Sequence, residues 1–427
     1  MNREILRIAL PAIVSNITTP LLGLVDVAIT GHIGSAAYIG AIAVGSTMFN
    51  MLYWLFGFLR MGTAGITSQS FGASDFHASS AALGRALLLS AVFSLLLIAL
   101  YKPLGFAILN FIDADDATAP LARAYFAMVI FGAPAVLGTY SLNGWLLGMQ
   151  NTRLPMAVAI LTNVVNIAVS ATAVFGFGMK IEGVALGTLT AQWTGFAVCV
   201  VALWRKYRPR HVGMRQLLSR KALARLFRIN SEIFLRTLCM VAVTAWFTRA
   251  GARQGVDILA ANAILLQLFM FFSYFSDGFG FAGEALAGKY YGARKLPELR
   301  RLIRELLVWG AWIALAFTAF YFLGGELIIG LLTDQTTVVH LARQYLPWAV
   351  SVPLCGFLAF IYDGVFVGLT ATRKMLLSVF GGMAVFFALY YLLEPSMGNS
   401  GLWLAFVAYL LSRGLILQAS IPSLTRQ

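Results

Sequence analysis

Long apolar segments follow one another along almost the whole chain, and short polar connections separate them. Twelve of these segments reach the roughly 20 residues that a membrane-spanning helix needs. They are expected over 6–30, 38–63, 79–104, 118–147, 154–177, 183–204, 229–250, 257–287, 302–324, 338–369, 374–393 and 399–420. The pattern therefore predicts an all-α integral membrane protein with twelve transmembrane helices.

The second half of this pattern repeats the first at a constant distance along the sequence. We call this distance, which separates Ala122 from Ala342, the repeat offset. The motif ARAY at 122–125 returns as ARQY at 342–345, and the GA pair at 72–73 returns at 292–293. Asn143-Gly144 likewise returns as Asp363-Gly364. Because each half holds an even number of spans, both enter the membrane in the same orientation, which predicts two parallel six-helix bundles. Such internal duplication is the usual build of a secondary transporter.

Charged residues make up 11% of the chain, against roughly 25% in a soluble domain, and the net charge is +14. Basic residues gather in the connection 205–228 and again after 287, while the alternate loops are acidic or nearly neutral. This positive-inside pattern predicts that both termini are cytoplasmic, and it favours anionic lipid headgroups over nucleic acid as the partner of the basic loops. The chain accordingly divides into an N-terminal lobe (1–204), a basic cytoplasmic linker (205–228) and a C-terminal lobe (229–427).

The tail of that linker, 220–228, alternates basic and apolar residues, as in a short amphipathic helix on the membrane surface. A merely solvated linker is the alternative.

Asp26 is the one acidic residue within a predicted span of the N-terminal half. An ionised carboxylate deep in a span costs about 2.5–3.5 kcal/mol or more, so a carboxyl without a basic partner there is a candidate proton acceptor. A carboxyl satisfied by hydrogen bonds between helices is the alternative. Pro11 and Pro20 interrupt the same span and predict a place where it can bend. Polar residues of nearby spans that can complete a site are Asn143, Asn163, Asn166, Thr188 and Gln192.

The C-terminal half carries three acidic residues and one arginine at comparable depth. Asp277 and Glu284 are two turns apart and share one helix face. Arg236 and Asp363 are expected at a similar level in their own spans. Because pairing lowers the cost of burying charge, a structural ion cluster is one interpretation, and a second ion or substrate site is the other.

Cysteine and histidine add no chemistry of their own. The three cysteines fall in apolar spans, show no metal-ligand spacing and need no disulfide. Only four histidines exist, and no nucleophile–base arrangement lies within the spans. We therefore expect no catalytic residue, metal or cofactor, and a protein that is not an enzyme.

Several motifs together resemble the multidrug and toxic compound extrusion (MATE) family, and in particular its DinF-like branch. They include Leu10-Pro11, the run PLLGLVD at 20–26, Gly31-His32, Leu59-Arg60-Met61, the run GITSQ at 65–69, Gly148-Met149-Gln150, Asn163 with Asn166, and Asp277-Gly278. The resemblance covers the whole chain. It implies a V-shaped transporter of the bacterial inner membrane, expected to be a monomer, that exports amphipathic and often cationic drugs against an inward H+ or Na+ flux.

Within that resemblance, Asp26 occupies the position of the coupling aspartate, and Pro11 that of the residue where the first helix bends. Asn143, Asn166 and Thr188 occupy positions of its polar partners. Members of the family often carry a second aspartate four residues after the asparagine matching Asn166, but this chain has Ser170 there. A lone carboxylate favours H+ over a two-acid Na+ site. Na+ coupling through Asp363 and its neighbours stays open, as does a flippase for lipid-linked precursors.

Overall fold

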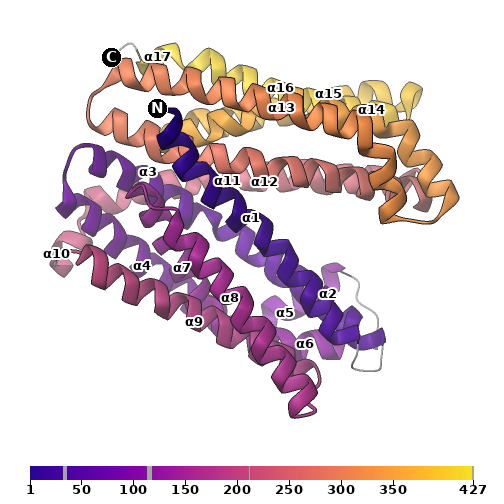
Figure 1. Ribbon diagram of the computed structural model, residues 1–427, viewed down its shortest axis with the longest axis horizontal. Coiled ribbons are helices and arrows are strands. Elements are labelled where there is room, and N and C mark those ends of the chain that lie inside the picture. Colours follow the sequence, from indigo (N-terminus) through magenta and orange to yellow (C-terminus); the bar gives the residue numbers. More distant parts are fainter. Residues whose placement is uncertain (32–35, 113–117, 211, 426–427) are drawn as a thin grey trace. The chain divides into compact units, whose positions relative to one another are not determined.

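The computed structural model describes residues 1–31, 36–112, 118–210 and 212–425, and for some residues of the first helix, Asp26 among them, it describes the backbone alone. Every regular element in these ranges is a helix (Figure 1). The all-α prediction is confirmed.

Contacts divide the chain into two compact units. The N-terminal unit comprises Val14–Phe227, and the C-terminal unit comprises Met1–Ile13 with Arg228–Gln427. The first boundary lies inside α1 (Asn2–Gly31), which is one continuous helix through both Pro11 and Pro20. The three-part division into two lobes and a linker stays a prediction.

In the N-terminal unit, the rest of α1 is followed by α2 (Ala36–Trp54), η1 (Leu55–Gly57), α3 (Phe58–Gly72), α4 (Phe76–Ala99) and α5 (Tyr101–Ile112). Then come α6 (Ala119–Val129), η2 (Ile130–Gly132), α7 (Ala133–Gly148), α8 (Arg153–Ala171), η3 (Thr172–Gly176), α9 (Ile181–Tyr207) and α10 (Met214–Leu217). Helix α7 packs against α3 and α4, and α8 packs against α9. One apolar core of this unit, between α4, α7, α8 and α9, contains Leu83, Leu142, Trp145, Leu146, Met149, Val158, Cys199 and Leu203.

The C-terminal unit contains α11 (Arg220–Arg253) from Arg228 onward, α12 (Val256–Gly292), α13 (Leu296–Leu332), α14 (Thr336–Gly368), α15 (Thr372–Met397), α16 (Asn399–Ser420) and α17 (Pro422–Thr425). Helix α14 packs against α12, α13 and α16, and α15 packs against α16. Residues 220–228 are helical, as predicted, but they do not form a short helix: they are the first turns of the long helix α11.

Eleven helical segments of the described ranges are long and apolar enough to cross a membrane. Each coincides with one of the last eleven predicted spans. The first predicted span corresponds to α1, a helix of 30 residues that is not among the eleven. The count of twelve spans therefore stays a prediction.

The internal repeat is visible in the backbone itself. Helices α3 and α12 both end with a residue at φ −76°, ψ −1°, followed by a left-handed residue, Ser74 (φ 57°) or Arg294 (φ 56°). Helices α7 and α14 are likewise followed by Gln150 (φ 63°) and Thr370 (φ 52°). All four are helix ends closed by a left-handed residue, and the members of each pair are separated by the repeat offset.

The same offset relates two very close helix crossings. A Cβ atom on Gly144 of α7 would lie 2.2 Å from the carbonyl oxygen of Arg60 in α3. A Cβ atom on Gly364 of α14 would lie 1.9 Å from the carbonyl oxygen of Gly280 in α12. Glycine at both positions lets the backbones touch, as is common between membrane helices. The predicted duplication is confirmed at the level of helix packing.

Candidate functional site

A group of hydrogen-bonded polar side chains joins α6, α8 and α9 in the N-terminal unit. Asn166 is fully buried, and its Nδ2 donates to Oγ1 of Thr188 at 3.1 Å. Thr188 Oγ1 in turn donates to the carbonyl oxygen of Val184 at 3.1 Å. Since that bond uses the hydroxyl hydrogen, Thr188 accepts from Asn166 and from the hydroxyl of Tyr125, which lies 3.4 Å away. Two of the predicted polar partners thus meet.

Asn163 extends this group to α1. It lies three residues before Asn166 and hence on nearly the same face of α8. Its Nδ2 donates to the backbone carbonyl oxygen of Thr18 at 2.8 Å. Amide groups on one face of α8 therefore bind both α9 and the backbone of α1 between its two prolines.

Four of the predicted partners carry a buried oxygen that forms no hydrogen bond within the described ranges. These atoms are Asn143 Oδ1, Asn166 Oδ1, Ser170 Oγ and Gln192 Oε1. A buried polar atom left without a partner costs about 1–3 kcal/mol, so each such atom points to a functional role, local strain, or a water or ion bound there. Ser170 lies one turn after Asn166 on α8 and is fully buried. Asn143 and Gln192 form no hydrogen bond to the Asn163–Asn166–Thr188 group in the described part of the chain.

Asp26, the predicted proton acceptor, belongs to α1, but its side chain lies outside what the structure describes. Pro11 is partly buried and Pro20 is exposed.

A second site, in the C-terminal unit, is a buried ion cluster centred on Asp363 of α14. Asp363 Oδ2 accepts hydrogen bonds from Nη2 of Arg236 in α11 and, at 2.7 Å, from Nη2 of Arg413 in α16. The two arginines are only 7% and 3% exposed. The guanidinium of Arg413 also packs over the ring of Tyr409, 5.2 Å from its centroid. One carboxylate thus faces two guanidinium groups.

Of the four residues predicted to form this cluster, the structure pairs two, Arg236 and Asp363. Glu284 is 1% exposed in α12 and Asp277 is partly buried two turns earlier, and neither is the salt-bridge partner of Arg236 or Arg413 in the part of the chain that the structure describes. Arg413 was missed by the sequence analysis. Its only signal was a lone basic residue inside the apolar segment 399–420.

Metal binding has no candidate in the described ranges, where no three His, Cys, Asp or Glu side chains gather closely enough to hold an ion. The cysteines there are free thiols.

The fold and the two sites define a helical membrane protein built from two repeated bundles, and comparisons with known proteins agree. The MatE family profile matches the chain twice, over 11–172 and 231–392. The chain is 37% identical to DNA damage-inducible protein F of Escherichia coli (strain K12) over 420 residues, which cover 98% of this chain and 91% of that one. It is 25% identical to the multidrug resistance protein NorM of Vibrio cholerae over 440 residues, 99% of this chain and 96% of that one.

Solved structures show the same fold. A crystal structure of a MATE protein in the bent conformation aligns with a TM-score of 0.89 at 17% identity and covers 100% of this chain and 96% of that one. An outward-facing multidrug resistance MATE transporter of the MOP superfamily aligns with a TM-score of 0.84 at 19% identity and covers 99% of this chain and 96% of that one. The chain belongs to the MatE family. The starts of the two matched segments, 11 and 231, are separated by the repeat offset.

Proposed function

We propose that this protein is a secondary active multidrug exporter that expels amphipathic, often cationic compounds from the cytoplasm in exchange for H+, with protonation of Asp26 as the coupling event. Relatives across the family carry names of drug export, such as the multidrug resistance proteins MdtK and NorM. Family members are transport proteins, which fits a role without bond-making chemistry.

The observation that carries the proposal is the set of buried, incompletely bonded polar groups on α8 beside α1. Asn163 binds the backbone of α1 at Thr18. The first and fifth predicted spans run through the membrane in the same direction, and each helix rises about 1.5 Å per residue. Asp26, about two turns beyond Thr18, therefore comes level with the end of α8, near Ser170. Buried Oδ1 of Asn166 near that level accepts only and needs a donor, such as a protonated carboxyl, whereas the Ser170 hydroxyl can donate or accept.

Coupling then follows from the different demands of the two protonation states. An ionised carboxylate only accepts hydrogen bonds, whereas a protonated one also donates. An acceptor-only oxygen such as Oδ1 of Asn166 favours the protonated form, so proton binding would favour the arrangement that brings α1 closest to α8. A proton can bias transport only because it binds the two arrangements with different affinities.

The charges of the C-terminal unit argue against the Na+ alternative. A Na+ ion at Asp363 would have to compete with two guanidinium groups that already occupy its Oδ2. Ser170 in place of a second N-terminal acid removes the other two-carboxylate arrangement. A flippase for pyrophosphate-linked lipids would use free basic groups along its path, but Arg236 and Arg413 are paired with a carboxylate.

The test is substrate-induced proton flux in proteoliposomes, with ethidium as substrate, with and without Na+, for wild type and Asp26→Asn. Asp257→Asn, at the first turn of α12, is the matched control. We expect Na+-independent flux that persists in the control and disappears in Asp26→Asn. Equal flux in wild type and Asp26→Asn would refute the role of Asp26, and flux that requires Na+ would move coupling to another site.

A further inference from the structure

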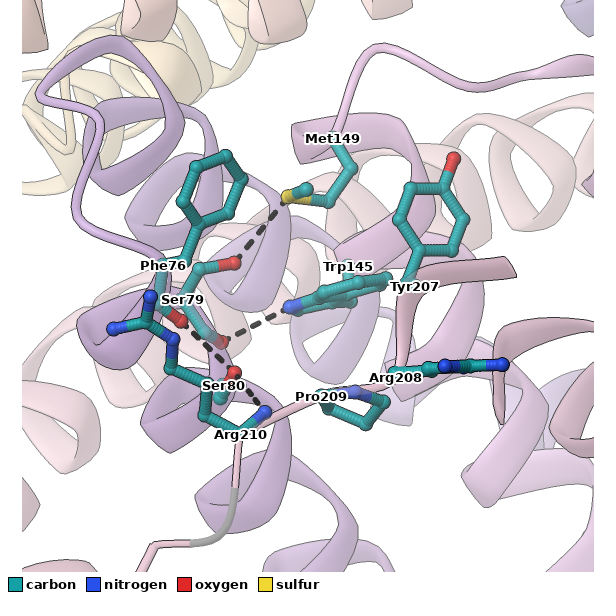
Figure 2. Close-up of a pocket in the computed structure, with 9 residues that line it drawn as sticks. All are labelled: Phe76, Ser79, Ser80, Trp145, Met149, Tyr207, Arg208, Pro209 and Arg210. Atoms are coloured by element: carbon teal, nitrogen blue, oxygen red, sulfur yellow. Dashed lines mark hydrogen bonds between the residues drawn. The ribbon is translucent and has the colours of Figure 1, made fainter. Parts of the chain in front are cut away.

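A cavity of about 170 Å³ lies in the N-terminal unit where α4 begins, α7 ends and the chain leaves α9 (Figure 2). Its lining includes three aromatic residues, Phe76, Trp145 and Tyr207. It also includes two serines of α4, Ser79 and Ser80, and the arginines Arg208 and Arg210. Pockets for drug-sized ligands measure about 300–1,000 Å³. The cavity is too small for a transported drug and suits a small polar group.

Specific bonds build this cavity. Trp145 Nε1 donates to the carbonyl oxygen of Ser79 at 2.9 Å, and the Trp145 ring meets that of Tyr207 edge to face at 5.2 Å between centroids. The backbone N–H of Arg210 donates to Oγ of Ser80 at 3.1 Å (Figure 2). The segment after α9 is thereby fixed against the start of α4.

One arginine of α4 holds the next part of the same segment. Arg85 Nε donates to the carbonyl oxygen of Leu217 at 3.2 Å, and its Nη2 donates to that of Gln216 at 3.0 Å. The basic connection is therefore bonded to α4 at Arg210 and again at Gln216 and Leu217, and this part of it is not a freely solvated linker. These bonds hold the backbone that carries Arg208 and Arg210.

The charged side chains at the cavity are all basic. Figure 2 shows the Arg210 side chain extending toward Phe76 and the serines of α4, whereas the Arg208 side chain extends in the opposite direction, away from them. Both side chains are exposed, and no acidic side chain of the described residues lines the cavity. Arg208 and Arg210 both line this small aromatic-walled cavity, and exposed arginine side chains can turn toward a bound anion, so the cavity suits a phosphate oxyanion attached to an apolar body.

Arg208 also adopts a backbone conformation that its side chain disfavours. It ends α9 in the left-handed region, at φ 43°, ψ 65°. A residue with a Cβ atom pays about 1–2 kcal/mol there, and glycine is the usual residue. A retained arginine at this position is consistent with a use for its guanidinium.

The other half of the repeat lacks these features. The counterparts of Ser79, Trp145 and Met149 at the repeat offset are Leu299, Val365 and Leu369, all buried and apolar. The polar cavity is therefore a specialisation of the N-terminal unit and not a consequence of the fold that both halves share.

We propose that this cavity binds the phosphate group of an anionic phospholipid from the cytoplasmic leaflet, with Arg208 and Arg210 contacting the phosphate and the aromatic wall contacting the glycerol and first methylenes. The site lies next to the basic connection that the charge pattern assigns to the cytoplasmic side. Its occupancy is independent of whether Asp26 carries the coupling proton.

The experiment measures phosphatidylglycerol retained by the full-length protein in native mass spectrometry, and the shift in apparent melting temperature on adding phosphatidylglycerol or phosphatidylcholine. We expect selective retention of phosphatidylglycerol, with an affinity that falls about tenfold or more in Arg208→Gly/Arg210→Ala. The single variant Arg208→Gly guards against misfolding, because glycine suits the left-handed backbone. It should lose affinity while its melting temperature without lipid stays equal or rises.

Arg205→Ala/Arg215→Ala removes the same charge from residues that do not line the cavity and should retain the lipid. Equal loss in this control, or equal retention in Arg208→Gly/Arg210→Ala and wild type, would overturn the proposal. Added glycerol 3-phosphate and inorganic phosphate distinguish the sources of the anion. If either gives the same melting shift as the lipid at equal concentration, the site binds free phosphate and the lipid assignment is wrong.

Discussion

The two halves of the repeat share a backbone but place different chemistry on it. The helix ends at Ser74 and Arg294, and those at Gln150 and Thr370, have the same left-handed geometry. The residues that correspond to the N-terminal polar group are different. At the repeat offset, the counterparts of Asp26, Asn166 and Ser170 are Trp246, Phe386 and Tyr390.

Those counterparts form an aromatic cluster. Phe386 and Tyr390 stack at 6.3 Å between centroids, and Trp246 meets Tyr390 edge to face at 6.1 Å and Phe387 at 5.5 Å. Rings packed in this way gain about 0.5–1.5 kcal/mol per pair beyond their buried area. The region of the C-terminal unit that corresponds to the polar group therefore stabilises the bundle.

At the ion cluster the difference between the halves is reversed: the C-terminal unit carries the polar residues that form the interaction. Arg236 and Asp363 form a salt bridge, whereas their counterparts in the first half are the neutral residues Asn16 and Asn143. The side-chain oxygen of Asn143 forms no hydrogen bond within the described ranges. In the C-terminal unit, two buried guanidinium groups thus share one carboxylate as their ion-pair partner, while the N-terminal unit contains buried neutral acceptors. A bundle that pairs its charges is suited to hold its shape, and one with unpaired acceptors is suited to respond to a proton.

The largest expected effect tests the role of the ion cluster. Asp363→Asn leaves two buried guanidinium groups without their carboxylate, which should cost about 3–5 kcal/mol in the free energy of unfolding. Asn143→Leu, at the corresponding position of the other half, should cost much less because its side-chain oxygen has no hydrogen bond to lose within the described ranges. Unfolding by SDS titration in mixed micelles measures both values.

A double-mutant cycle sharpens this result. Arg413→Gln with Asp363→Asn should cost less than the sum of the two single changes, because each removes the same interaction. If Asp363→Asn instead leaves stability unchanged and abolishes proton flux, the two halves have the opposite roles.

The sequence predicted the spans and the repeat well, because apolar length and recurring glycines are local signals. It also predicted that Arg236 and Asp363 would meet, since both are charged residues at similar depth. It missed Arg413, because a lone arginine inside an apolar segment does not by itself show which residue it pairs with. It could not predict the docking of the linker, since Arg85 binds backbone carbonyl oxygens, which every residue has.

A smaller loss of stability, equal in the two halves, is expected at the close helix crossings that both halves share. Gly144→Ala and Gly364→Ala each introduce a Cβ atom that meets a carbonyl oxygen of the crossing helix at 2.2 and 1.9 Å. Each should therefore destabilise the protein by about 1–3 kcal/mol, and by similar amounts. Gly324→Ala is the control, because nothing lies within 4 Å of its Cβ position in α13 among the described residues. It should be neutral or gain up to about 1 kcal/mol in stability. The same SDS titration measures both losses. A large difference between them would show that the two crossings, although alike in backbone geometry, contribute differently to stability.

The smallest expected effect concerns α1, whose first turns belong to the C-terminal unit. Glu4 Oε1 accepts a hydrogen bond from Lys289 Nζ at 2.8 Å, and Oε2 accepts one from Tyr290 at 2.9 Å. Burial alone would raise the pKa of Glu4, but these bonds and the charge of Lys289 outweigh it and hold the pKa below the usual value of 4.5. The stabilisation is therefore present above pH 4.5 and is lost as the pH falls through the lowered pKa.

Glu4→Gln should lower the free energy of unfolding at pH 7 by at most about 1 kcal/mol, because the pair is partly exposed. As the pH falls below 4.5, the apparent melting temperatures of wild type and Glu4→Gln should converge. Glu182→Gln, at the exposed first turn of α9, is the matched control because it removes one carboxylate that forms no salt bridge in the described ranges. A constant gap between wild type and Glu4→Gln down to about pH 3 would mean that the charge of Glu4 contributes nothing. The start of α1 would then be held to α12 by contacts that do not depend on this charge, such as the packing of Ile13 against Gly278.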